Sequence, residues 1–377
     1  MGQQAGTVVD DSALDAAEHA SLTAARERSR EIEIEMREHP ERFRMLTGDR
    51  PTGRLHIGHY FGSLRNRVSA QALGVESWVV IADYQVITDR DAVGPVQERV
   101  YSLLTDYLAV GLDPSRCTFF AHSAVPALNQ LMLPFLALVT EAELHRNPTV
   151  KAELAASGRR AMSGLMLTYP VHQAADILFC KANLVPVGKD QLPHVEQARV
   201  IAGRFDATYG RGDLDRPVFP RPEALLSEAT NVLGVDGQKM SKSRGNAIEL
   251  GLSQDETAKL IRRAVTDSER TITWDPQRRP EVANLLLLAS LCTGQPPEQI
   301  AAQVGGQGAG RLKQIVTEAL NAELAPVRAR RAELQRDPGY LHAVLAEGNA
   351  RAREQADQTL SEVRRAMHMA YESMDLG

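Results

Sequence analysis

Short apolar runs that alternate with helical segments constrain the fold of this 377-residue chain more than any other feature. The apolar runs, which we interpret as strands or strand ends, lie at 45–48, 78–82, 118–121 and 184–187. Segments with helical spacing separate and follow them at 58–73, 93–110, 128–144 and 191–205. The order predicts an α/β fold with a doubly wound parallel sheet, in which ligands bind at the carboxyl ends of the strands.

The chain divides by pattern into three regions. Residues 1–44 form an N-terminal extension that we expect to be partly disordered or helical, with poor order up to 25 and a solvated helix over 26–44. Residues 45–254 hold the strands and predict a Rossmann-like catalytic domain with a connecting insertion at about 125–165. After that the pattern is almost wholly helical, so 255–377 predicts an α-helical C-terminal domain.

Composition excludes several classes of protein. The formal net charge is -5, so a nucleic-acid partner would have to bind local basic patches. Cys117, Cys180 and Cys292 are widely spaced and form no CxxC, so we expect reduced cysteines, with no zinc site and no iron–sulfur cluster. No apolar stretch approaches the ~20 residues of a membrane span, and no signal-peptide core is visible, which predicts a cytoplasmic protein with no membrane partner.

A turn rich in glycine and proline follows the first strand and leads into a helix near Gly58. Free amides and the positive end of the helix dipole favour an anion at such a start. Gly58 lets a flat ring such as adenine approach the backbone, because it has no side chain. His56 and His59 lie three residues apart and can donate to phosphate oxygens. As a metal site this pair lacks a third ligand at useful spacing.

The segment Lys239-Met240-Ser241-Lys242-Ser243 is the second phosphate-binding candidate. Its two lysines supply mobile positive charges, and its two serines supply hydroxyl groups. Transfer of a phosphoryl or nucleotidyl group needs this kind of positioning and charge stabilisation more than covalent help. The chain contains no GxxxxGK[ST] and no GxGxxG, so it has neither a P-loop nor a dinucleotide fingerprint.

Three polar residues mark the segment that we expect to determine substrate specificity. Tyr169, Gln173 and Asp176 are spaced four and three apart, so they share one face of a helix. Asp176 offers an acceptor that suits an indole N–H, which can only donate. The alternative is an aspartate at the helix surface or in an ion pair. Its apolar neighbours on both sides argue against that alternative.

The histidine turn 56–59 and the lysine segment 239–243 resemble the paired signatures of class I aminoacyl-tRNA synthetases. The stretches 47–53, 174–178 and 185–191 resemble the tryptophan and tyrosine subclass, and their residue pattern is typical of its tryptophan members. The resemblance covers roughly residues 45–370. It implies activation of L-tryptophan by ATP with Mg²⁺ and transfer to tRNA(Trp), by a homodimer whose C-terminal helices bind the anticodon.

The resemblance also implies roles for individual residues. The catalytic residues would be His56, His59, Lys239 and Lys242. ATP would be bound by Arg50, Pro51, Thr52, Gly58, His59, Gly188, Lys189, Asp190, Val232, Lys239, Met240, Ser241, Lys242 and Ser243. Tryptophan would be bound by Leu46, Tyr169, Gln173, Asp176, Val185, Val187 and Gln191. Lys151 would contact pyrophosphate, with a solvated lysine as the alternative. No metal would be held by the protein itself, because Mg²⁺ is carried by ATP.

Gln173 departs from the tryptophan pattern. Many bacterial tryptophan enzymes of this kind carry methionine there, and glutamine resembles the tyrosine-specific relatives. Those relatives usually place a tyrosine at the position of Leu46, so the substrate hydroxyl would lack that partner here. Tryptophan is therefore favoured. The alternatives are a tyrosine enzyme, a synthetase paralogue with a binding role, and a nucleotidylyltransferase that shares the histidine turn.

Basic side chains gather in the C-terminal helical region. They are Arg311, Lys313, Arg328, Arg330, Arg331, Arg336, Arg351, Arg353, Arg364 and Arg365. Such a region suits contacts with an RNA backbone. Because acidic residues are interleaved with them, the alternative is the charged surface of a helical bundle.

Overall fold

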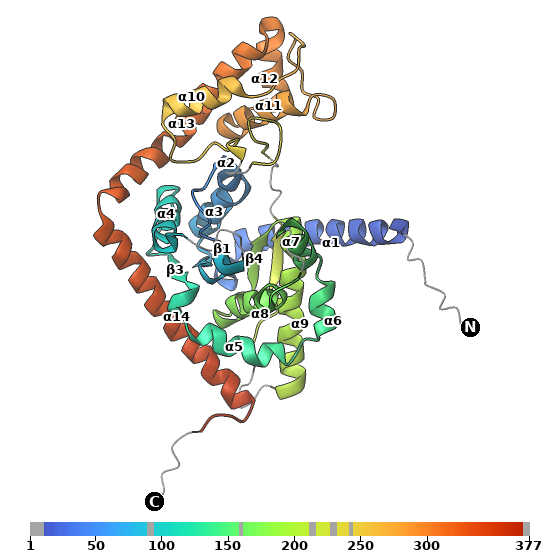
Figure 1. Cartoon of the computed structure of the whole chain (residues 1–377), viewed down its shortest axis with the longest axis vertical. Helices are drawn as coiled ribbons and strands as arrows, with labels where there is room; N and C mark the ends of the chain where they lie inside the picture. The colour runs from blue at the N-terminus through green and yellow to red at the C-terminus, as the bar shows by residue number, and fades with distance from the viewer. Residues whose placement is uncertain are drawn as a thin grey trace, which may run out of the picture.

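The chain folds around one parallel sheet, with helices on both of its faces and a group of helices at one end (Figure 1). The computed structural model describes residues 11–88, 94–157, 161–210, 216–226, 232–240 and 244–371. Among the described helices, none is long and apolar enough to cross a membrane.

The sheet confirms the predicted doubly wound α/β architecture. Within the described residues it has five parallel strands in the order β3-β2-β1-β4-β5. The strands are β1 (Arg44–Asp49), β2 (Glu76–Ile81), β3 (Cys117–Ala121), β4 (Leu184–Val187) and β5 (Glu223–Leu226). From β1 the chain adds strands first on one side and then on the other, so the order reverses between β1 and β4. Ligands bind at such a switch point.

Helices connect the strands and cover both faces. They are α2 (Ile57–His59), the π-helical turn η2 (Tyr60–Leu64), α3 (Arg65–Leu73), α4 (Val96–Ala109), α5 (Ala127–Leu136), α6 (Glu141–Arg146), α7 (Pro148–Ser157), α8 (Gly164–Phe179) and α9 (Leu192–Tyr209). The single helix predicted over 128–144 is wrong. It breaks into α5 and α6, because Thr140 accepts a hydrogen bond from the Glu143 amide and caps a new helix.

Alternate side chains of β2 enter two different cores. Trp78 and Val80 of β2 pack with α5, α8 and α9, and Val79 and Ile81 pack with α4 and the C-terminal helices. This explains the continuous apolar run of the strand. Packing requires glycine at position 48, because a Cβ there would lie 2.0 Å from the carbonyl oxygen of Val80.

The C-terminal helices do not form a fully separate domain, because two of them pack against the sheet domain. They are α10 (Gln254–Arg263), α11 (Pro280–Thr293), α12 (Pro297–Val304), α13 (Ala309–Gln335) and α14 (Pro338–Ala366). Helix α13 contacts α4 and α11, and α14 runs back along β3 and α5 (Figure 1). A Cβ at Gly348 of α14 would lie 1.8 Å from the Phe119 carbonyl, so helix and strand meet backbone to backbone. The functional boundary at 254 stays a prediction.

The N-terminal helix α1 (Asp11–Glu38) begins earlier than expected and is not fully solvated. Ile32 and Met36 are buried among residues of the sheet and α3. The Ser29 hydroxyl accepts a hydrogen bond from the Leu226 amide at 2.9 Å, and Arg28 forms an ion pair with Glu223 at 2.7 Å. Helix α1 therefore covers β5, which would otherwise be an exposed sheet edge.

Candidate active site

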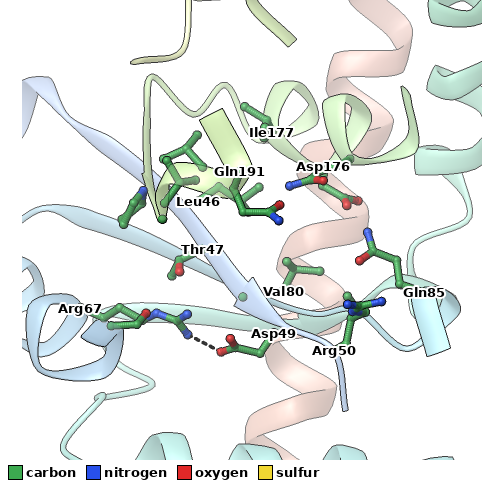
Figure 2. Close-up of a pocket in the computed structure, with 18 of the residues that line it drawn as sticks. Leu46, Thr47, Asp49, Arg50, Arg67, Val80, Gln85, Asp176, Ile177 and Gln191 are labelled. Carbon is green, nitrogen blue, oxygen red and sulfur yellow. Dashed lines mark hydrogen bonds and ion pairs between the residues drawn. The ribbon is translucent and has the colours of Figure 1, made fainter. Parts of the chain in front are cut away.

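A cavity of about 330 Å³ opens at the carboxyl ends of β1 and β4, at the switch point of the sheet. The labelled side chains of Leu46, Asp176 and Gln191 surround it in Figure 2. All seven residues predicted to bind the amino acid line this cavity: Leu46, Tyr169, Gln173, Asp176, Val185, Val187 and Gln191. The shared helix face of Tyr169, Gln173 and Asp176 is confirmed by their common cavity.

Asp176 is the most constrained polar group of the cavity. It is 2% exposed, so the alternative of an aspartate at the helix surface is excluded, and its apolar neighbours on both sides are buried as well. Its Oδ2 atom lies 2.8 Å from Nε2 of His122, which follows β3. Its other oxygen, Oδ1, is buried and has no hydrogen-bond partner within the described part of the chain. A buried acceptor without a partner costs stability unless a ligand donates to it.

The Tyr169 hydroxyl is held by a hydrogen bond to a buried histidine. The hydroxyl lies 3.2 Å from Nε2 of His194, a fully buried residue of α9. Burial lowers the pKa of His194 to about 4, although the charge of Asp190 acts in the opposite direction. His194 is therefore neutral at pH 7 and can hold the tyrosine without adding charge to the site.

A partly buried ion pair that lines the cavity, Arg67 with Asp49, was not predicted from the sequence. Arg67 donates to the Asp49 carboxylate at 2.7 Å, as the dashed line in Figure 2 marks, and the Tyr107 hydroxyl donates to the same oxygen at 2.7 Å. Burial alone would raise the pKa of Asp49, but the nearby Arg67 guanidinium lowers it below its ordinary value. The pair places fixed charges at the end of β1, on the wall of the cavity.

The histidine turn forms the start of α2, as predicted. The rings of His56 and His59 lie 3.8 Å apart between centroids, and the His56 amide donates to Nδ1 of His59 at 3.2 Å. The turn is tied to the segment after the lysines, because the Ile57 amide donates to the Ile248 carbonyl at 2.9 Å. The two histidines therefore sit on one side of a helix start, where an anion is favoured.

The lysine segment reaches the histidine turn. A Cβ on Gly58 would lie 3.5 Å from the sulfur of Met240, so the two motifs are in contact. Met240 is buried and Lys239 is exposed. The Asn246 side chain holds the base of the segment by donating to the Lys239 carbonyl at 3.1 Å. Ser241, Lys242 and Ser243 lie outside the described residues.

Among the other residues predicted to bind ATP, Arg50 and Gly188 line the cavity. Pro51, Thr52, Lys189, Asp190 and Val232 do not line it, and Val232 packs in the core that also contains Met240. Lys151 is exposed on α7. That helix lies beside the turn after β4, because the Thr149 hydroxyl donates to the Asp190 carbonyl at 2.8 Å.

Three metal-capable side chains lie together within the described part of the chain. The potential ligand atoms of His122, His172 and Asp176 are within 4.8 Å of one another, and all three residues are buried. The sequence pointed only to Asp176. His172 is 3.3 Å from the Asn129 side-chain oxygen, and burial lowers its pKa.

Several of the C-terminal basic residues are engaged within the protein. Arg331 pairs with the buried Asp106 of α4 at 2.8 Å, and Arg328 donates to Thr257 at 2.9 Å. These two side chains therefore have internal structural partners. Others, including Arg336 and Arg365, are exposed.

Comparison with known proteins gives consistent matches. The family model for class I tRNA synthetases (W and Y) matches residues 38–325. The chain is 42% identical over 337 residues to the tryptophan–tRNA ligase of Clostridium longisporum, which covers 87% of this chain and 97% of that protein. It is 41% identical over 336 residues to the corresponding ligase of Treponema pallidum, which covers 87% of this chain and 97% of that protein. The solved tryptophanyl-tRNA synthetase of Campylobacter jejuni, complexed with ADP and tryptophan, matches with a TM-score of 0.73 and 32% identity over 86% of this chain and 99% of that one.

Proposed function

We propose that this chain, which belongs to the class I tRNA synthetases of the tryptophan and tyrosine type, is a tryptophan–tRNA ligase. It would use ATP to convert tryptophan to tryptophanyl-adenylate and then transfer the tryptophanyl group to tRNA(Trp). The chain spans 97% of its C. longisporum relative, so the relationship extends over almost the whole of that ligase.

One observation carries the proposal: the amino-acid cavity combines apolar walls with a buried acceptor that has no partner among the described residues. Leu46, Val185 and Val187 supply apolar surface for a ring, and Asp176 Oδ1 can accept the indole N–H. Tyr169 and Gln191 line the same cavity and would hold the α-amino group. A ligand that fills the cavity and donates to Asp176 would remove the cost of the unpaired oxygen.

The chemical step needs charge stabilisation rather than a covalent enzyme intermediate. The carboxylate of tryptophan attacks the α-phosphorus of ATP, the bond to the bridging oxygen breaks, and pyrophosphate leaves. His56 and His59 would donate to the phosphates, and Lys239 and Lys242 would stabilise the leaving pyrophosphate. The contact between Gly58 and Met240 supports this, because it brings the lysine segment to the histidine turn.

We expect Mg²⁺ to arrive on ATP, where it neutralises phosphate charge. The lysines and serines of the segment 239–243 are cationic or hydroxyl-bearing, which suits phosphate oxygens rather than direct ligation of a metal. Lys151 would approach the pyrophosphate from α7, as the neighbouring contact of Thr149 with Asp190 supports.

The second step would place the terminal ribose of tRNA(Trp) at the adenylate. The exposed arginines of α13 and α14 would contact the RNA backbone, and the helical region from 255 would bind the anticodon. The homodimer implied by the family resemblance stays a prediction, which light scattering on the purified chain would test.

Amino-acid-dependent ATP–pyrophosphate exchange, measured with tryptophan and tyrosine side by side, tests the proposal. We expect exchange with tryptophan and little with tyrosine. Gln173 lines the cavity and is the one feature that favours tyrosine, so Gln173→Met is a useful companion variant that should keep tryptophan exchange. Exchange with tyrosine alone would overturn the specificity. No exchange with either, on folded protein, would favour a paralogue with a binding role.

A further inference from the structure

His122 lies behind the amino-acid cavity rather than in it. The residue follows β3 and begins the short turn His122–Ala124. It is 1% exposed, and it does not line the cavity. Its Nε2 atom lies 2.8 Å from Oδ2 of Asp176. Because a carboxylate can only accept, Nε2 carries the hydrogen of this bond.

The ring of His122 is held on several sides. Tyr84 stacks on it with centroids 6.4 Å apart and planes at 26°, and His172 meets it edge-on at 4.8 Å. The turn itself is anchored, because the Ser123 amide donates to the Asp83 side chain at 3.0 Å. A side chain packed in this way keeps one orientation, so its hydrogen bond fixes the carboxylate as well.

This arrangement leaves Asp176 with one acceptor for a ligand. Oδ2 of Asp176 is hydrogen-bonded to His122. Oδ1 has no hydrogen-bond partner among the described residues, and Asp176 lines the cavity. A ligand that donates a hydrogen bond at this point is favoured. A ligand of the same shape without a donor leaves Oδ1 unpaired, and sites with such unpaired groups discriminate strongly.

A metal ion held by His122, His172 and Asp176 is the competing explanation for this cluster. Zinc bonds of about 2.05 Å in a tetrahedral site would separate ligand atoms by roughly 3.3 Å. The observed separation of 2.8 Å between His122 Nε2 and Asp176 Oδ2 is that of a hydrogen-bonded pair. The geometry therefore favours a donor and an acceptor that share a proton over two ligands of one ion.

We propose that His122 is a positioning residue that holds Asp176 so that the cavity selects ligands with an N–H donor. The inference rests on the proposed function, because it takes tryptophan as the ligand. It adds a specificity determinant that has no contact with the substrate and acts through the carboxylate alone.

Binding of tryptophan and of its benzothienyl analogue, in which sulfur replaces the indole N–H, tests the inference. Calorimetry without ATP would compare the full-length wild type with His122→Leu and His122→Gln. We expect the wild type to prefer tryptophan by about 10-fold or more. His122→Leu should reduce that preference to about 2-fold or less, and His122→Gln, which keeps a donor, should retain most of it.

His172→Phe is the matched control, because it keeps an aromatic ring at the position that packs against His122. His172 is also buried and lies beside His122, but its hydrogen-bond partner is Asn129 rather than Asp176. The variant should keep the preference for tryptophan even where both ligands bind more weakly. If His122→Leu does not fold, His122→Asn replaces it, because the shorter amide cannot reach Oδ2 and should also lose the preference.

Equal weakening of both ligands in the His122 variants would overturn the inference, since a merely structural histidine would act in that way. The proposed function would still stand in that case if the wild type supports pyrophosphate exchange with tryptophan. A wild type that binds neither ligand and shows no exchange would instead overturn the proposed function, and the inference with it.

Discussion

We expect single cationic side chains to stabilise the negative charge that develops on phosphate in the activation step. Lys242 lies in the lysine segment and would meet the pyrophosphate as it leaves. Removal of one such group typically lowers kcat by about 10²- to 10³-fold. We therefore expect Lys242→Ala to depress tryptophan-dependent exchange by about that factor, while the Kd for tryptophan changes by less than about 3-fold.

Single-turnover formation of the adenylate and direct binding of tryptophan would separate these two effects. Lys259→Ala, at an exposed position of α10, is the matched control and should change neither. Equal losses in binding and in the chemical step would contradict the role of Lys242, because the lysine would then act on the ground state as well.

A buried histidine makes stability depend on pH. The pKa of His194 falls from 6.5 to about 4 on folding, because burial disfavours its charged form. Below pH 6.5 the unfolded chain therefore binds a proton that the native protein does not, so stability falls as pH decreases toward 4. Between pH 7.5 and 5 we expect this group to cost about 2 kcal/mol of the free energy of unfolding.

Urea unfolding at the two pH values measures this effect. The wild type should lose about 2 kcal/mol more than His194→Gln over the same interval. His145→Gln, at an exposed site, controls for the loss of a histidine. Identical pH dependence in the wild type and in His194→Gln would contradict a neutral, buried His194.

The residues of the cavity that the sequence revealed have something in common. Tyr169, Gln173 and Asp176 lie close together on one helix, so their spacing alone placed them on one face. His122 and Arg67 were missed, because their partners Asp176 and Asp49 lie 54 and 18 residues away. No local pattern reports contacts of that kind, which exist only once the sheet has brought the segments together.

At the scale of elements, strands β1 to β4 were predictable and the edge strand β5 was not. The first four strands are apolar runs, as expected of strands buried on both faces. Strand β5 has four residues, and its first two, Glu223 and Ala224, are only partly buried, so it gives no such signal. Helix α1 was expected to be solvated, because its charged residues conceal the two apolar positions that dock on the sheet.

Helix α1 offers a matched pair of isoleucines. Ile32 is 0% exposed and Ile34 is 58% exposed. Ile32→Ala should lower the free energy of unfolding by about 2–4 kcal/mol, because it leaves a cavity between the helix and the sheet. Ile34→Ala should change it by less than about 0.5 kcal/mol. Urea unfolding of both variants would test whether the helix docks, and equal effects would contradict docking.

At the scale of the whole molecule, the C-terminal helices and the catalytic sheet are joined by buried contacts. Arg331 of α13 pairs with Asp106 of α4, and Asp106 also accepts a hydrogen bond from the Leu55 amide at 3.2 Å, next to the histidine turn. The sequence offered Arg331 only as a candidate for RNA binding. Its partner is 225 residues away, so its structural role emerges from the tertiary fold alone.

Aminoacylation of tRNA by the purified chain tests the central claim most directly. Labelled tryptophan or tyrosine would be supplied with ATP and Mg²⁺, and with tRNA(Trp) or tRNA(Tyr). The account predicts tryptophan on tRNA(Trp), with little product in the other three combinations. Tyrosine on tRNA(Tyr), or no charging of tRNA(Trp) by folded protein that binds tryptophan, would contradict it.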